Sequence, residues 1–162
     1  MALIKDKMAN NKVQVTKVGF EALEKELNEL VETKRPKLVE RLSNARAEGD
    51  LSENSDYTNA KEELEFLDGR IAELQNVVKN AEVIASNGTS SGEVALGSRV
   101  IVKQSDNEHT FHIVGEWEAD PAEKKISHTS PLGQALIGKA KGEKVEVEAP
   151  AGKIVYEVLK VH

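Results

Sequence analysis

Residues 57–81 read YTNAKEELEFLDGRIAELQNVVKNA. Apolar side chains recur in this stretch at alternating intervals of three and four residues, at Tyr57, Ala60, Leu64, Leu67, Ile71, Leu74, Val78 and Ala81. Such intervals place one apolar stripe along one side of an α-helix, and their regularity is the heptad pattern of a coiled coil. The stretch therefore predicts a long helix with a single buried seam.

A similar stripe runs along an earlier stretch. Its apolar positions are Phe20, Leu23, Leu27 and Leu30, followed after a slip by Leu38, Leu42 and Ala45. Pro36 lies at the slip and lacks a backbone N–H, so we expect a kink or local unwinding there rather than the end of the helix. Thr16 precedes the stripe and suits an N-cap, although the nearby Gly19 weakens the assignment of the helix start.

Two stripes joined by a short polar break describe an antiparallel helical hairpin. Each arm spans roughly 30 residues, so at 1.5 Å per residue it reaches about 45 Å. That length exceeds the width of a small domain, so the hairpin should project with only its seam buried. The break is the segment EGDLSEN at residues 48–54. Gly49 suits the left-handed residue that ends a helix, and Asp50 or Ser52 suits the cap of the next one.

The composition changes after Ala85. Residues 86–92 (SNGTSSG) have the composition of a linker. Short stretches typical of β-strands follow at Arg99–Lys103, Thr110–Val114, Lys144–Glu148 and Ile154–Val161, with room for one short helix at Leu132–Ile137. We therefore predict an α+β protein. Its parts are a polar N-terminal extension at 1–15, a coiled-coil hairpin at 16–85 with an acidic tip at 48–56, a linker at 86–92, and a small, mostly β domain at 93–162.

Composition excludes several classes of function. The 162 residues carry a formal charge of −6 and no cysteine, so disulfides, thiolate zinc sites and cysteine nucleophiles are excluded. No clustered basic face is present, and we expect no strong independent binding to nucleic acid. No apolar stretch is long enough to span a bilayer, and the polar first dozen residues lack a signal-peptide core. We predict a cytoplasmic protein without a membrane partner.

The tip concentrates carboxylates where no core requires them. Asp50 and Glu53 are three residues apart, with Glu48 and Asp56 nearby. At a helix start such a pair projects to one side and offers half a site for a hard divalent cation such as Mg²⁺. The alternative is a capping box, since acidic residues also favour a helix N-terminus. Capping, however, does not explain why the hairpin is so long.

Other templates for catalysis fail. The four histidines, His109, His112, His128 and His162, are scattered through the β-like half or its end, which is typical of ordinary strand or loop positions. No glycine-rich phosphate loop follows a predicted strand.

The tip segment 48–57, EGDLSENSDY, resembles the tip signature of the GreA/GreB transcript cleavage factors. Arg35-Pro36 in the first arm, Gly69-Arg70-Ile71 in the second and SPLGQALIG at 130–138 also resemble that family. The resemblance spans nearly the whole chain from about Lys17. The acidic balance is more similar to GreA than to GreB.

The resemblance implies a function outside the chain itself. In this family a C-terminal domain similar to the FKBP fold binds the rim of the secondary channel of bacterial RNA polymerase. The coiled coil enters the channel and brings its tip to the active centre. There it stimulates the polymerase's own cleavage of the extruded RNA 3′ end in backtracked complexes. The resemblance thus implies an accessory factor rather than an enzyme.

The resemblance also implies residue roles. Asp50 and Glu53 match the family's catalytic pair, which helps to bind the second Mg²⁺ of the polymerase active centre and orients the attacking water. We expect no Mg²⁺ on the isolated protein, because the ion is held jointly with the polymerase. Asn54 and Tyr57 match positions that support the tip, although Tyr57 also suits the first seam residue. Ser52 replaces a lysine found there in some members.

Two further groups carry weaker assignments. Arg46 and Lys61 flank the tip and are candidate contacts to the RNA backbone, against the simpler interpretation of exposed helix charge. Ser130, Pro131 and Leu132 match a loop that the family presents to the polymerase, against the simpler interpretation of a domain turn.

Two other functions stay open at this point. One is a Gre-like paralogue that inhibits the polymerase through the same channel. The other is a structural coiled-coil adaptor whose tip is only a capped turn.

Overall fold

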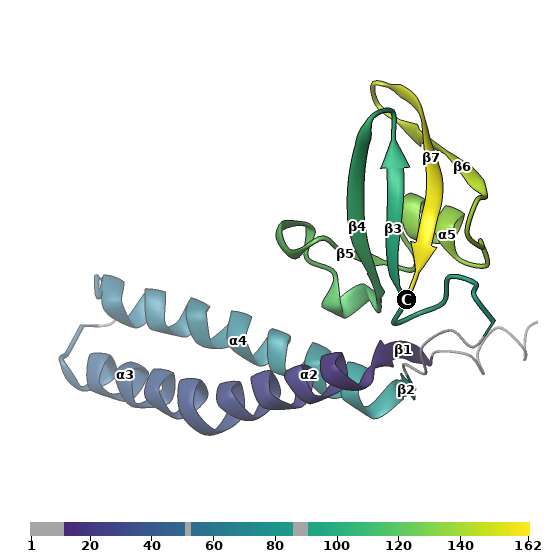
Figure 1. The fold of residues 1–162 in the computed structure, drawn as a ribbon. Coiled ribbons are helices and arrows are strands. Elements are labelled where there is room, and N and C mark those ends of the chain that lie inside the picture. Colours follow the sequence, from purple (N-terminus) through teal and green to yellow (C-terminus); the bar gives the residue numbers. More distant parts are fainter. Residues whose placement is uncertain (1–11, 51–52, 86–90) are drawn as a thin grey trace, which may run out of the picture. The chain divides into compact units, whose positions relative to one another are not determined.

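The computed structural model describes residues 12–50, 53–85 and 91–162. The chain divides into two compact units (Figure 1). One is Glu21–Asn80, and the other combines the described residues before Glu21 with Ala81–His162. The helical first half and the mostly β second half that the sequence predicts are both confirmed.

The first helical arm follows one path from Lys17 to Ala47. It consists of α2 (Lys17–Glu29), the π-helical turn η1 (Leu30–Lys34) and α3 (Arg35–Ala47). The N–H of Arg35 bonds to the carbonyl oxygen of Leu30, five residues back. A wider turn fits here because Pro36 offers no N–H and its ring would crowd the carbonyl four residues earlier. The predicted unwinding is confirmed, and it begins a few residues before the proline.

The second arm is α4 (Ser55–Asn80), which runs antiparallel to the first (Figure 1). Its buried residues are Ala60, Leu67, Ile71, Leu74 and Val77, and those of the first arm include Leu23, Leu30 and Ala45. Val77 is buried in place of the predicted Val78, and Leu64 is half-buried. Ion pairs beside the seam join the arms: Glu26 with Arg70 at 3.1 Å, Arg35 with Asp68 at 2.7 Å, and Arg41 with Glu63 at 3.2 Å.

Two short strands that the sequence pattern did not indicate flank the helical arms in the chain. β1 (Val13–Thr16) and β2 (Ala81–Ile84) pair in parallel, with Val13 opposite Ala81. Val15 in β1 is fully buried. The predicted extension and hairpin therefore each contain residues that belong to this strand pair.

The C-terminal sheet has five strands in the order β5-β4-β3-β7-β6. Their bounds are β3 Arg99–Gln104, β4 Asn107–Val114, β5 Lys125–Ser127, β6 Lys144–Ala149 and β7 Gly152–Val161. Neighbours are antiparallel except β4 and β5. The core beneath consists of Val94, Val100, Val102, Ile113, Leu136, Val145 and Val158. The four predicted strands and the short helix, α5 (Pro131–Leu136), are confirmed, while β5 was not predicted.

Glu118 ties the start of α2 to the C-terminal part of its own unit. Its carboxylate accepts hydrogen bonds from the N–H of Thr16 at 2.9 Å, the Thr16 hydroxyl, and the N–H of Gly115 at 3.0 Å. The Thr16 oxygen accepts from the N–H of Gly19 at 3.1 Å, which confirms Thr16 as the N-cap. A Cβ on Gly19 would lie 1.9 Å from the Glu118 carboxyl carbon. The Glu118 carboxylate thus occupies the space that a side chain at position 19 would need, which explains why that residue is a glycine.

Within the described residues, no helix is both long and apolar enough to cross a membrane.

Candidate functional site at the tip of the helical arms

The first arm ends as the sequence predicts. α3 stops at Ala47, Glu48 is its C-cap, and Gly49 has a φ of +120°. Only glycine adopts a positive φ of this kind without steric cost, so Gly49 allows the chain to leave the helix.

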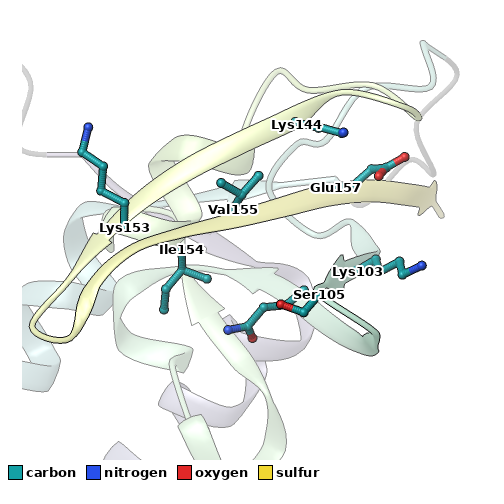
Figure 2. A pocket seen from close by; sticks show the side chains of 8 residues that line it. Lys103, Ser105, Lys144, Lys153, Ile154, Val155 and Glu157 are labelled. Carbon is teal, nitrogen blue, oxygen red and sulfur yellow. The ribbon is translucent and has the colours of Figure 1, made fainter.

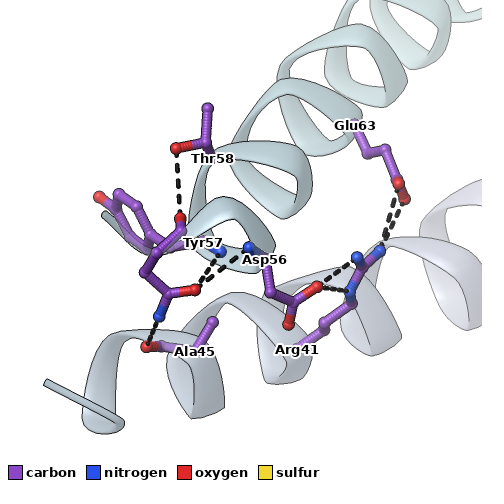
Figure 3. A network of polar contacts seen from close by, with 7 residues as sticks. Arg41, Ala45, Asp56, Tyr57, Thr58 and Glu63 are labelled. Atoms are coloured by element: carbon purple, nitrogen blue, oxygen red, sulfur yellow. Dashed lines mark hydrogen bonds and ion pairs between the residues drawn. The ribbon is translucent and has the colours of Figure 1, made fainter. Parts of the chain in front are cut away.

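The second arm is capped by a residue that the sequence analysis did not choose. The Oδ1 atom of Asn54 accepts hydrogen bonds from the N–H groups of Asp56 at 3.1 Å and Tyr57 at 3.2 Å (Figure 3). This is N-cap geometry for a helix that starts at Ser55. The assignment of the cap to Asp50 is therefore wrong, and Ser52, its alternative, lies outside the described residues. The sequence offered several cap residues in a row and no local rule to choose among them.

The same asparagine holds the two arms together. Its Nδ2 atom donates a hydrogen bond to the carbonyl oxygen of Ala45 at 2.8 Å (Figure 3). That carbonyl is one of the last in α3, where its only backbone bond among the described residues is a long one of 3.4 Å from the N–H of Glu48. Ala45 is only 2% exposed, and its small side chain lets the arms approach closely.

Asp56, one of the four tip carboxylates, pairs with the first arm. Asp56 accepts a hydrogen bond from Arg41 Nε at 3.0 Å, and Arg41 Nη1 lies 3.2 Å from both oxygens of Glu63 (Figure 3). Hydrogen bonds to Asp56 and then to Glu63 raise the pKa of the Arg41 guanidinium above its usual value. The Asp56 carboxylate is thus part of an ion-pair network with Arg41 and Glu63.

Asp50 and Glu53 are placed differently. Both are exposed, and Glu53 precedes the first residue of α4. A capping box needs its acidic residue at the third helical position, so the capping-box interpretation of this pair is wrong. The expectation that both stand on one helix start is also wrong, because neither lies in a helix. Leu51 and Ser52, between them, lie outside the described residues.

The donor atoms at the tip suit a hard cation only in part. Carboxylate oxygens are ligands that Mg²⁺ prefers, but Mg²⁺ requires near-octahedral coordination. Within the described residues, no three His, Cys, Asp or Glu side chains gather closely enough to hold a metal ion. Any Mg²⁺ bound by Asp50 and Glu53 would need further ligands to complete its coordination.

Three more predicted residues surround this tip. Tyr57 is half-buried in the first turn of α4, and its N–H is one of the two that Asn54 caps. Arg46 is exposed in the last turn of α3. Lys61 is also exposed, and its ammonium lies 4.0 Å from Glu65 on the same helix. The structure thus brings Tyr57 to the tip cap, whereas Arg46 and Lys61 stay on the helix surface.

Comparison with known proteins identifies the family. Residues 13–83 match the model described as "Transcription elongation factor, N-terminal", and residues 89–162 match "Transcription elongation factor, GreA/GreB, C-term". Transcription elongation factor GreA of Clostridium acetobutylicum is 46% identical over 152 residues, covering 93% of this chain and 96% of that protein. The chain belongs to the GreA/GreB transcription elongation factor family.

A second relative agrees with this GreA/GreB assignment. GreA of Streptococcus pyogenes strain Manfredo is 45% identical over 156 residues, covering 95% of this chain and 98% of its own. The resemblance seen in the tip motif, and its closeness to GreA, are therefore confirmed. Among solved structures, the crystal structure of GreA factor homolog 1 of Thermus thermophilus is 29% identical and covers 94% of this chain and 99% of its own, with a TM-score of 0.44.

The second GreA/GreB-like motif, at 130–138, has a clear role in the fold. The Ser130 hydroxyl donates to the carbonyl oxygen of Ser127 at 2.7 Å and accepts from the N–H of Gly133 at 3.1 Å, which caps α5. Leu132 packs against the core, while Pro131 is exposed. A Cβ on Gly133 would lie 2.0 Å from the Ser127 oxygen, so the turn requires glycine. Of the three predicted contact residues, Pro131 alone presents an exposed side chain.

The C-terminal half of this GreA/GreB family chain also carries a surface hollow of about 520 Å³ (Figure 2). Lysines, a glutamate and smaller side chains line it: Lys103, Gln104, Ser105, Lys144, Lys153, Ile154, Val155 and Glu157. The strand register sets Glu157 opposite both Lys103 and Lys144. Because this lining has no histidine and no pair of carboxylates, the helical tip remains the stronger candidate site.

Proposed function

We propose that the chain is a transcript cleavage factor for bacterial RNA polymerase. Its helical arms act as a coiled-coil hairpin that enters the secondary channel, and its FKBP-like C-terminal domain docks at the channel rim. The tip then reaches the active centre of a backtracked, arrested complex. There it stimulates cleavage of the RNA 3′ end, so that elongation can resume. The endonuclease is the polymerase, and this chain is its accessory factor.

The observation that supports the proposal is the exposure of two carboxylates, Asp50 and Glu53, next to the residue that caps α4. Asn54 supplies the helix cap, and Arg41 engages Asp56. Asp50 and Glu53 precede this cap, and both are exposed. An exposed carboxylate pair at the ends of the two helical arms suits contact with a partner molecule.

The chemistry assigned to the tip is completion of a metal site. Asp50 and Glu53 would supply carboxylate oxygens to Mg²⁺ held jointly with the polymerase, and accept a hydrogen bond from the attacking water. Mg²⁺ bound there supplies charge neutralisation at the RNA phosphate and activation of water. The Asn54–Ala45 hydrogen bond and the Tyr57 turn keep the two arms together just behind the pair. Arg46 and Lys61 are assigned as contacts to the RNA backbone, because both are exposed basic side chains on the helical arms.

Docking is assigned to the C-terminal domain. Ser130 and Leu132 shape the loop, and Pro131 is its exposed contact residue. The chain's net charge of −6 opposes independent binding to RNA or DNA. It therefore meets the nascent RNA 3′ end only when the polymerase holds both.

The experiment is transcript cleavage in a stalled, backtracked elongation complex. Addition of the protein should increase the rate of RNA 3′-end cleavage and restore elongation. Inhibition of the polymerase would instead identify the Gre-like inhibitory paralogue. No effect on cleavage or elongation would identify a structural coiled-coil adaptor.

A further inference from the structure

An aromatic side chain stands exposed on the second arm. Phe66 in α4 is 80% exposed, more than any other large apolar side chain among the described residues. Gly69 lies one helical turn further on. Apart from proline, glycine is the least favourable residue in a helix interior. A Cβ at Gly69 would meet no atom within 4 Å, so packing within this chain does not require the glycine.

Together these residues form a groove. Phe66, Gly69, Arg70 and Glu73 lie at helical spacing on one face of α4, and with Glu65 they line a space of about 340 Å³. The missing side chain at Gly69 makes the notch, and the Phe66 ring forms its apolar wall. A surface with both features suits the insertion of a side chain from another molecule.

The rim of the groove is acidic. Arg70 is held by Glu26 at 3.1 Å and by Glu73 at 2.9 Å. Among the described residues, the cation that pairs with Glu65 is the Lys61 ammonium, at 4.0 Å. Glu62 lies one turn before Phe66, whereas the neighbouring Glu63 is paired with Arg41. This charge repels a phosphate backbone and attracts a cationic side chain.

We propose that this groove, lined by Glu65, Phe66, Gly69, Arg70 and Glu73, receives a lysine or arginine side chain of RNA polymerase. The alkyl part of that side chain packs into the notch over Gly69. Its cation lies against the Phe66 ring and near the Glu65 carboxylate, as in a cation–π contact. The proposal rests on the proposed function, because it names a protein contact of the same inserted arm.

The groove lies at a fixed distance from the tip, so a contact there would set the position of the tip. Phe66 is eleven residues after Ser55, the first residue of α4, so at 1.5 Å per residue it lies about 17 Å from the helix start. An anchor at this point fixes how deeply the arm sits in its partner and thus where Asp50 and Glu53 arrive. Phe66 and Gly69 are positioning residues, because they take no part in the chemistry.

The test measures affinity for RNA-free core polymerase together with the melting temperature of each variant. Gly69→Ala should raise the melting temperature, because alanine favours the helix, and yet weaken binding about ten-fold by filling the notch. Phe66→Ala should weaken binding by a similar factor, about ten-fold, without lowering the melting temperature. Gln75→Ala, at an exposed position of the same helix, is the matched control and should change neither quantity.

Charge reversal identifies the occupant. Glu65→Lys should weaken binding to RNA-free polymerase if the groove receives a basic protein side chain. Stronger binding to RNA-free polymerase would overturn the proposal in favour of an acidic protein surface. An effect that appears only when RNA is present would overturn it in favour of an RNA contact. If the wild type binds polymerase while Gly69→Ala and Phe66→Ala bind equally well, this inference fails and the proposed function stands. If the wild type does not bind polymerase, both fail.

Discussion

The side-chain amide of Asn54 donates a hydrogen bond to the carbonyl oxygen of Ala45 at 2.8 Å, and this bond joins the end of α3 to the start of α4. The other end of the same amide accepts from the N–H groups of Asp56 and Tyr57. One side chain therefore caps the second arm and ties it to the first. The acidic residues of the turn are held next to this clamp.

Two replacements of Asn54 distinguish its helix cap from its hydrogen bond to Ala45. Asn54→Ala removes the cap and the tie and should lower the free energy of unfolding by about 0.5–2 kcal/mol. Asn54→Asp keeps an acceptor for the helix N–H groups but loses the donor to Ala45, so it should be more stable than the alanine variant. Both should stimulate transcript cleavage less than wild type, because the turn is no longer tied to α3. Urea unfolding followed by helical circular dichroism measures the first effect, and an Asn54→Ala variant as stable as wild type would contradict the capping assignment.

The second prediction concerns Glu118. Glu118→Ala leaves the N–H groups of Thr16 and Gly115 without their acceptor, and an unsatisfied buried N–H costs about 1–3 kcal/mol. The variant should therefore unfold at lower denaturant concentration, and the amides of Thr16 and Gly115 should exchange their hydrogens faster. Glu116 lies in the same short 3₁₀ helix, η2 (Glu116–Glu118), but is exposed, so Glu116→Ala is the matched control and should resemble wild type. Equal stability of the two alanine variants would show that the Glu118 contacts contribute nothing.

The third prediction is a dependence of stability on pH. His112 lies in β4 directly opposite Arg99 on one side and Lys125 on the other. Burial, then the charges of Arg99 and Lys125, lower the pKa of His112 below its ordinary value. As pH falls below about 6.5, the unfolded chain binds a proton before the folded chain does, so stability should decrease. Above that pH the contribution of His112 is constant.

Two variants check the assignment to His112. In His112→Gln the part of the pH dependence between about 6.5 and the lowered pKa should disappear. The same substitution at His109, in the same strand, should leave it in place. Denaturant unfolding at a series of pH values measures both. An unchanged pH profile in His112→Gln would contradict the prediction.

Much of this architecture follows from patterns that the chain carries locally. The heptad stripe from Tyr57 onward identifies α4, because only a helix brings residues three and four apart onto one face. The phase slip near Pro36 marks a π-helical turn, because a missing N–H perturbs the backbone wherever the helix packs. Gly49 marks the end of the first arm because its positive φ is a property of one residue.

What the sequence could not show depends on contacts distant in the chain. β1 and β2 are four residues each and far apart in sequence, so neither carries a pattern of its own. Asp56 looked like part of the acidic tip because its ion pair with Arg41 forms only when the arms pack. Several neighbouring residues could have capped α4, and the hydrogen bond from Asn54 to Ala45 of the other arm could not be predicted from the local sequence. Gly19 weakened the assignment of the helix start, because the Glu118 side chain that occupies the space beside it comes from a distant part of the sequence.

The most direct test of the account compares carboxylates at the tip. The double variant Asp50→Asn/Glu53→Gln and the single variant Asp56→Asn are assayed for cleavage in a backtracked elongation complex, after circular dichroism and polymerase competition show that both fold and bind. The account predicts that the double variant loses stimulation by about a hundred-fold or more, as expected for groups that stabilise charge in the transition state. Asp56→Asn should stimulate cleavage nearly like wild type, because that carboxylate serves Arg41. A double variant as active as wild type would contradict the account.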